Sequence, residues 1–313
     1  DVFTDIGTAQ MAVYGVYNMV SNAWSKRASM FFPVDDDCCV ISITSSDSNQ
    51  RKLARYQLAR DNGELHNWHY AMMRGYVRGS MCIEQLENSP LMKNESTKKE
   101  AERLLGEALT MRAVMMLQIV NLWGDVPFYV TSITPEEAFE MGRTDKAVVL
   151  KQIYEDYDYA AENLPAANNN SGATRVDKGT AYAYKARTAL YQHDYGTAAK
   201  AAQDCMDLEV YDLAPDYGEL FRDKTRGSKE VIFSVAHSSD LELDENGKPT
   251  TQAIGSFIAR SAGGTHNAQP SWELLAVYEM TNGKTIDEPG SGFDPHDPFA
   301  NRDPRCLETF AAP

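Results

Sequence analysis

Two adjacent helical segments near the middle of the chain leave the least freedom in how it can fold. Residues 178–192 and 195–206 both carry apolar residues at helical spacing, and only His193 and Asp194 separate them. A connection this short forces consecutive helices to run antiparallel as a hairpin. The small and bulky residues of this hairpin match part of the tetratricopeptide pattern, at Ala186, Leu190, Tyr195 and Ala198.

Four more segments with helical periodicity precede this hairpin. Apolar residues recur every three or four positions in residues 8–22, 64–87, 96–122 and 148–164. Gly124 ends the third of these segments and Pro165 ends the fourth. The sequence therefore predicts a mainly α fold, in which tetratricopeptide-like helical hairpins stack into a short solenoid.

The last third of the chain has a different composition. Residues 230–235 form a β-branched run, and Asn246-Gly247 is a strong signal for a β-hairpin. Residues 237–269 and 285–304 are rich in turn-forming residues and are expected to be ordered loops. We predict a single domain over residues 1–313, with a helical scaffold to about residue 210. Irregular loops and a few short strands are expected from there onward.

The charge balance argues against nucleic acid as a partner. The chain has 45 acidic and 30 basic side chains, which give a formal charge of −15. This charge repels phosphate backbones and anionic lipids.

No run of the sequence approaches the roughly 20 consecutive apolar residues that a membrane helix needs. Five cysteines without CxxC spacing predict buried thiols, and a bridge between Cys38 and Cys39 is the less favoured alternative.

Motifs for catalysis and metal binding are absent from the sequence. It contains no GxSxG, HExxH, P-loop or GxGxxG motif in a fitting context. His66 and His69 are three residues apart on a predicted helix but have no third ligand nearby. The acidic runs at 35–37 and 240–244 lack the spacing of a calcium loop. We therefore predict no catalytic residue, no metal site and no cofactor.

Several motifs, in order along the chain, point to one family. The segment Glu107–Ala113, followed by Leu122–Pro127, is similar to a highly specific helix and its exit turn in that family. Residues 180–221 match its central hairpin and the segment after it. Weaker or shorter matches lie in residues 1–18, 68–83, 278–284 and 301–305. Together these motifs resemble the SusD/RagB family of Bacteroidetes outer-membrane lipoproteins.

The resemblance implies a function as well as a fold. Members of this family have a tetratricopeptide-like scaffold, are anchored by lipid on an N-terminal cysteine, and face the cell exterior. They cap a SusC-like TonB-dependent transporter and hold a glycan without cleaving it. By this resemblance we expect an outer-membrane glycan-binding protein, not an enzyme. The anchoring cysteine and part of the family's C-terminal region are expected to be absent from this chain.

Loop aromatics and polar groups are the candidates for contacting a sugar. Flat aromatic faces cover the apolar face of a pyranose ring, while amide, carboxylate and guanidinium groups bind its hydroxyls. The candidate ligand-binding residues are Trp24, Phe31, Phe32, Asp37, Arg260, His266 and Asn267. Trp68, Trp123 and Trp272 are expected to pack in the core. Arg302 and Asp303 are expected to hold a loop by charge-assisted hydrogen bonds.

Three other functions stay open at this point. Peptide or glycopeptide capture for the same kind of transporter would use a similar scaffold. A glycoside hydrolase needs two carboxylates ~5 to ~10 Å apart, and 45 acidic residues make such pairs common by chance. A helical-repeat adaptor for a protein partner is the third.

Overall fold

The structure is a computed structural model, and its described residues form two compact units. It describes residues 3–27, 38–40, 57, 59, 61, 63–167, 174–221, 227–234 and 268–310. The first unit, called the helical unit here, comprises residues 1–23, 67–213 and 226–236. The second comprises residues 24–66, 214–225 and 237–313. A single domain over residues 1–313 stays a prediction.

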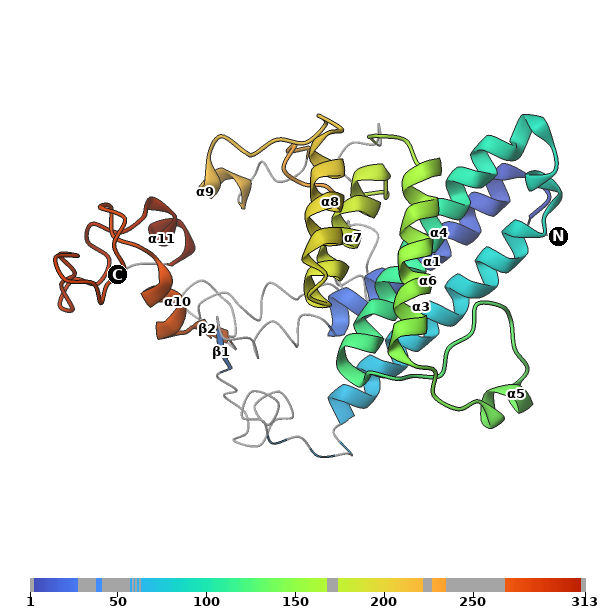
Figure 1. Cartoon of the computed structure of the whole chain (residues 1–313), viewed down its shortest axis with the longest axis horizontal. Coiled ribbons are helices and arrows are strands. Elements are labelled where there is room, and N and C mark those ends of the chain that lie inside the picture. The colour runs from blue at the N-terminus through green and yellow to red at the C-terminus, as the bar shows by residue number, and fades with distance from the viewer. Residues whose placement is uncertain are drawn as a thin grey trace, which may run out of the picture. The chain divides into compact units, whose positions relative to one another are not determined.

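Long helices make up the helical unit, as the periodicity predicted. Its main elements are α1 (Ile6–Arg27), α3 (Gly63–Glu87), α4 (Glu95–Trp123), α6 (Lys146–Asn163), α7 (Lys178–Tyr191) and α8 (Tyr195–Met206) (Figure 1). A short 3-10 helix, η3 (Pro90–Met92), connects α3 to α4. The mainly α fold is confirmed, and none of the described helices is long and apolar enough to cross a membrane.

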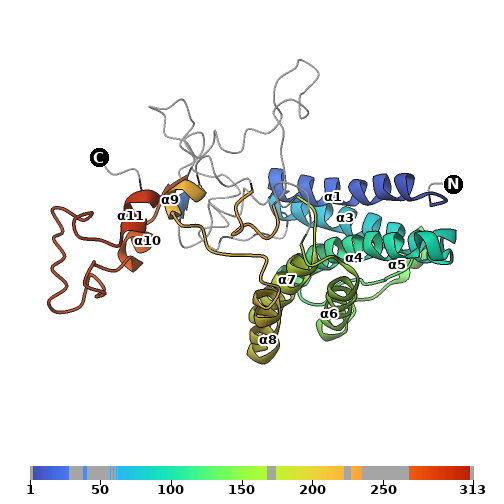
Figure 2. The same cartoon turned by 90° about the horizontal axis from the view of Figure 1, so that it is seen from above.

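The central element of this unit is α4. From Leu104 to Val120 every residue except Gln118 is buried. A helix that is buried around its whole circumference lies inside a bundle. It packs against α6, which packs against α7, and α7 packs against α8. On the other side α1, α3 and α4 lie side by side (Figure 2). The core of the unit therefore surrounds α4.

Local capping fixes where the helices begin and end. The side chain of Asn94 accepts a hydrogen bond from the Ser96 amide and starts α4, and Gly124 ends it with φ 68°. Asp194 accepts from the Thr197 amide and starts α8, and only three residues (192–194) lie between α7 and α8. The predicted α7–α8 hairpin is confirmed.

Two segments differ from the predictions. Residues 135–140 were not among the predicted helical segments, but they form the six-residue helix α5 (Pro135–Glu140), which a capping box between Thr134 and Glu137 stabilises. The β-branched run at 230–235 was expected to be a strand, but residues 230–234 form a turn and irregular backbone. Phe233 instead packs against Tyr17 of α1, with ring centroids 6.3 Å apart. Side-chain packing on helices thus takes the place of strand pairing.

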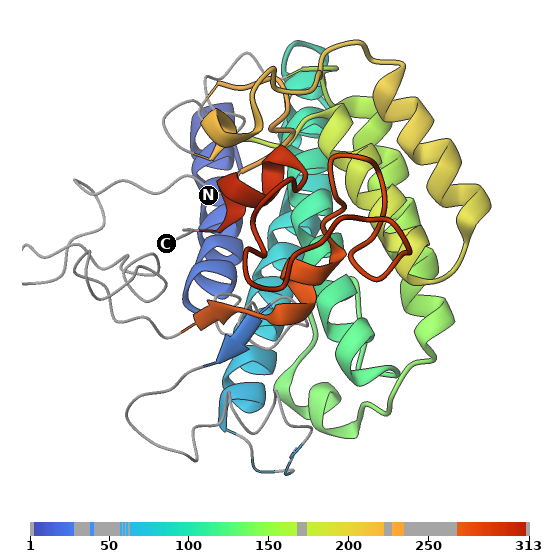
Figure 3. The same ribbon diagram turned by 90° about the vertical axis from the view of Figure 1, so that its left-hand side faces the viewer.

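The second unit contains the few short strands. Strand β1 (Cys38–Val40) pairs antiparallel with β2 (Ala268–Pro270) (Figure 3). Helix α9 (Tyr217–Leu220) packs against α11 (Pro304–Thr309), and α10 (Trp272–Val277) follows β2. Cys306 in this unit is a buried free thiol, as are Cys82 and Cys205 of the helical unit. The expected buried thiols are confirmed at these three positions.

Arg302 and Asp303 hold the C-terminal loop, as predicted. Arg302 is 4% exposed and donates hydrogen bonds to the carbonyl oxygens of Leu275, Tyr278 and Pro298. Asp303 caps α11, and hydrogen bonds from Arg305 hold the pKa of its carboxyl at about 2. Both residues therefore have structural roles.

The tryptophans divide between core and surface. Trp68 is 3% exposed and packs against Trp123 with ring centroids 5.6 Å apart, as expected. Trp272 was expected in the core but is 55% exposed. It opens the six-residue α10, in which Leu275 is the buried residue. So short a helix presents too small a face to bury the indole as well.

Candidate ligand-binding site

The predicted ligand-binding residues fall outside what the structure describes. Trp24 belongs to the last turns of α1, but its side chain is not among the described ones. Outside the described residues lie Phe31, Phe32, Asp37, Arg260, His266 and Asn267. Their role in binding stays a prediction.

The helical unit contains a hollow between α7 and a later segment of the chain. Its cavity volume is about 310 Å³, and its walls are residues 230–233 and the α7 side chains of Thr180, Ala183, Tyr184 and Arg187. These four positions follow the i, i+3, i+4, i+7 spacing of one helix face. We call this hollow the α7 pocket. The helical spacing was visible in the sequence, whereas the second wall was not.

Tyr184 and the guanidinium of Arg187 line one side of the α7 pocket, and a second tyrosine ring lies buried against Tyr184. Tyr184 stacks on the buried Tyr157 of α6, with ring centroids 6.4 Å apart and an interplanar angle of 9°. Burial raises the pKa of both tyrosines, so both phenols stay neutral near pH 7. The guanidinium of Arg187 lies over the Tyr184 ring at 5.4 Å from its centroid. The pocket thus presents an aromatic surface beside a cation.

The first turn of α7 is fixed by a buried carboxylate. Asp177 caps the helix and accepts hydrogen bonds from the Thr180 amide and hydroxyl, both at 2.9 Å. Its Oδ1 also accepts from the Tyr211 hydroxyl at 2.7 Å. Tyr211 lies directly against the backbone of Gly179, so the helix start and the chain after α8 are joined here. This contact positions Thr180, the first residue of the pocket wall.

We expect Gly179→Ala to destabilise the protein. An added Cβ would lie 2.2 Å from the Tyr211 ring and hydroxyl. Tyr211 would have to move away from Asp177, and such overpacking costs about 1–3 kcal/mol. Gly196 holds the same position in α8, but its Cβ would meet nothing closer than 3.8 Å. Gly196→Ala is the matched control and is expected to gain up to ~1 kcal/mol from helix propensity. Equal urea midpoints for the two variants would contradict the expectation.

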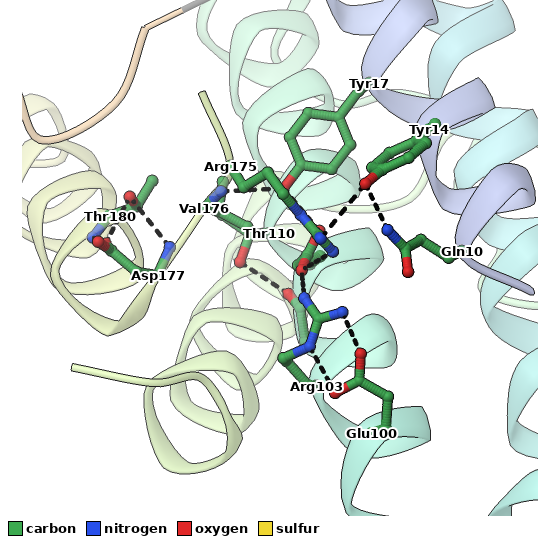
Figure 4. A network of polar contacts seen from close by, with 12 residues as sticks. Gln10, Tyr14, Tyr17, Glu100, Arg103, Thr110, Arg175, Val176, Asp177 and Thr180 are labelled. Atoms are coloured by element: carbon green, nitrogen blue, oxygen red, sulfur yellow. Dashed lines mark hydrogen bonds and ion pairs between the residues drawn. The ribbon is translucent and has the colours of Figure 1, made fainter. Parts of the chain in front are cut away.

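The segment before α7 is tied to α1 and α4 by a buried carboxylate, Glu107, whose partners Tyr17, Arg103 and Arg175 are labelled in Figure 4. Arg175 donates to Oε1 at 2.6 Å and to Oε2 at 3.2 Å, and Tyr17 donates to Oε2 at 2.9 Å. Arg103 completes the set with a hydrogen bond to Oε1. Burial raises the pKa of Glu107, although Arg175 and Arg103 act in the opposite direction. The four donors offset the cost of burying this group.

A second buried ion pair joins α4 to α6. Arg112 donates to the two carboxylate oxygens of Asp156 at 2.8 and 2.6 Å, and the two side chains are 5% and 3% exposed. Gln152 adds a third hydrogen bond to Asp156 at 2.9 Å. Asp156 precedes Tyr157, the residue on which Tyr184 stacks. The pair therefore fixes the α6 surface behind the pocket wall.

A second hollow, the α6–α8 groove, lies on another face of the same helices. Its volume is about 590 Å³, and it is lined by three acidic residues, three lysines and smaller side chains. Two of the lysines form ion pairs, Lys185 with Asp158 at 2.5 Å and Lys200 with Asp204. Most of the charge in this groove is therefore already neutralised by neighbours.

The described residues give no sign of metal or acid–base chemistry at the α7 pocket. Within the described part of the chain, no three His, Cys, Asp or Glu side chains are grouped to hold a metal ion. His69 packs edge-on against Trp123, with centroids 4.8 Å apart. The described part of the pocket lining contains one carboxylate, Glu230, whereas glycoside hydrolysis usually needs a pair. This geometry suits binding.

Comparison with known proteins found a matching protein family and a related protein. Residues 8–190 match a SusD-like family described as starch-binding and associating with the outer membrane. A SusD-like protein of Formosa agariphila is 27% identical over 181 residues, which are 57% of this chain and 33% of that protein. The chain thus spans about a third of this curated relative.

Solved structures share the fold. A SusD-like carbohydrate-binding protein of Bacteroides fragilis has a TM-score of 0.81 at 22% identity, covering 98% of this chain and 60% of the other. A laminarin-binding SusD-like protein has a TM-score of 0.69 at 21% identity, covering 79% of this chain and 54% of the other. Both solved relatives extend well beyond the length matched here.

Proposed function

Because the chain belongs to the SusD-like family, we propose that it captures a glycan at the bacterial outer membrane and releases it intact. The family match over residues 8–190 carries this proposal, since it includes α4 and all of α7 except its last residue. The carbohydrate-binding and laminarin-binding descriptions of solved relatives support it. The α7 pocket is the part of the described structure that we assign to the ligand.

The remaining features of the proposal rest on the family. We propose that the protein is held at the outer membrane by an N-terminal lipid, faces the exterior, and delivers its ligand to a SusC-like TonB-dependent transporter. The family description supports the outer-membrane location. Co-expression of the two proteins and purification in detergent test the complex. Elution of the two proteins as separate peaks would count against it.

We expect isothermal titration to detect at least one glycan from a panel of plant, host and microbial oligosaccharides. A capture protein needs only moderate affinity, with a dissociation constant between ~1 mM and ~1 µM. Ala183→Leu places a larger side chain in the α7 pocket and is expected to weaken binding about tenfold or more. Ala199→Leu on the exposed face of α8 is the matched control and leaves binding unchanged.

Each other outcome has a distinct meaning. Failure of every glycan, together with binding of an oligopeptide, would replace sugar by peptide as the ligand. Glycan binding that survives Ala183→Leu would move the site away from α7, and the predicted set around Trp24 would be the next to mutate. Sustained release of shortened oligosaccharides during incubation would show a hydrolase instead of a binding protein.

A further inference from the structure

Among the described residues that line the α7 pocket, Arg187 is the one cation. It is exposed, and its guanidinium lies over the ring of Tyr184. Apart from this ring contact, it has no hydrogen bond or ion pair in the described structure. By contrast, carboxylate oxygens accept hydrogen bonds from the guanidinium groups of Arg103 and Arg112. The Arg187 donors are therefore left for something that enters the pocket.

An arginine held in this way is suited to an oxyanion. Its guanidinium presents five N–H donors in a planar fork that matches the two oxygens of a carboxylate or sulfate. Stacking on Tyr184 restrains the side chain before the ligand arrives, so less conformational entropy is lost on binding. Charge-assisted bonds of this kind are about twice as strong as neutral ones.

The rest of the lining suits a sugar that carries such a group. A volume of about 310 Å³ is at the lower end of the ~300–1,000 Å³ of small-molecule sites, which leaves room for one sugar ring and its substituent. Glu230 also lines the pocket, and carboxylate oxygens accept hydrogen bonds from sugar hydroxyls. Fields from the net charge of −15 are screened beyond about 8 Å in physiological salt, so a bound anion is governed by its distances from Arg187 and from the carboxylate of Glu230.

We propose that the α7 pocket recognises one acidic unit of a glycan, with Arg187 binding its carboxylate or sulfate. This inference rests on the proposed glycan capture and adds the class of sugar. A uronic acid has a planar carboxylate and a sulfated sugar has a tetrahedral sulfate, but both offer a pair of anionic oxygens to a guanidinium, and they are separate arms of the test.

The experiment is isothermal titration of the whole chain with four oligosaccharides. The acidic probes are a galacturonic acid trimer and a sulfated carrageenan oligosaccharide, and the neutral probes are maltohexaose and laminarihexaose. We expect at least one acidic probe to bind more tightly than both neutral ones, and its affinity to fall as NaCl is raised. Arg187→Gln should weaken that probe about tenfold or more, and Arg187→Lys should weaken it less, because lysine keeps the charge but lacks the fork.

Arg74→Gln is the matched control. Arg74 also lies over a tyrosine, Tyr70, at 5.4 Å from the ring centroid and is exposed, but it does not line the pocket. Its loss should leave the affinity for acidic probes unchanged. Two results would overturn the inference while leaving glycan capture standing: tighter binding of a neutral probe, or equal affinity of Arg187→Gln and Arg74→Gln for the acidic one. Failure of all four probes and of the wider glycan panel would remove both proposals together.

Discussion

Asp156→Ala is expected to lower the free energy of unfolding by about 3–5 kcal/mol, because it leaves the buried guanidinium of Arg112 without its carboxylate. Both side chains are nearly inaccessible, so water cannot replace the lost partner. Urea or thermal unfolding followed by circular dichroism measures the change. The tyrosine stack behind the α7 pocket lies next to Asp156, so weaker ligand binding should accompany the loss of stability.

Asp158→Ala is the matched control for this change. Asp158 lies two residues further along α6 and pairs with Lys185, but its side chain is 57% exposed. An exposed ion pair contributes about 0–1 kcal/mol, so this variant should stay close to the parent. A double change of Arg112→Met and Asp156→Leu should recover much of the lost stability, since apolar pairs often replace buried ion pairs without cost. Equal losses in Asp156→Ala and Asp158→Ala would contradict the assigned role.

Glu107→Ala is expected to have an effect of similar size, about 3–5 kcal/mol. The change removes the acceptor shared by Arg103, Arg175 and Tyr17, and it leaves two partly buried cations close together. Tyr17 also accepts a hydrogen bond from the Val176 amide at 2.9 Å. Hydrogen exchange should therefore quicken in the segment that leads into α7, as well as in α1.

Glu102→Ala is the control on the same helix. Glu102 forms a surface pair with Lys98, with N and O atoms 3.7 Å apart, so its loss should cost less than about 1 kcal/mol. Glu107→Gln keeps one acceptor oxygen and should lie between the two alanine variants. Unchanged hydrogen exchange at Val176 in Glu107→Ala would show that the network does not hold this segment.

The helical scaffold was predictable because its signals are local. The spacing of apolar residues gave α3, α4, α6, α7 and α8 to within two residues at each end. Gly124 and Pro165 marked helix ends for local reasons. Glycine readily adopts the positive φ found at a helix end, and proline has no amide N–H with which to continue a helix. The charged residues of α4 also carried a signal. Glu107 and Arg112 interrupt an apolar helix, and buried charges require partners.

The partners themselves depend on contacts that are distant in sequence. Arg175 lies 68 positions from Glu107, and Asp156 lies 44 positions from Arg112, so spacing alone does not pair them. The run at 230–235 shows the same limit. Its β-branched residues favour a strand. Whether the segment forms one depends on whether the fold places another strand beside it, and the sequence of the segment does not show this. The second wall of the α7 pocket was missed for this reason.

That second wall has a consequence for how shortened versions of the protein are designed. A recombinant fragment that ends just after Tyr211 would keep the described helices from α1 to α8 and the contact between Tyr211 and Asp177. Such a fragment would nevertheless lack residues 230–233, and its α7 face would be open to solvent on one side. Ligand screens on fragments should therefore extend beyond Phe233, because normal helicity in a shorter piece says nothing about its ability to bind.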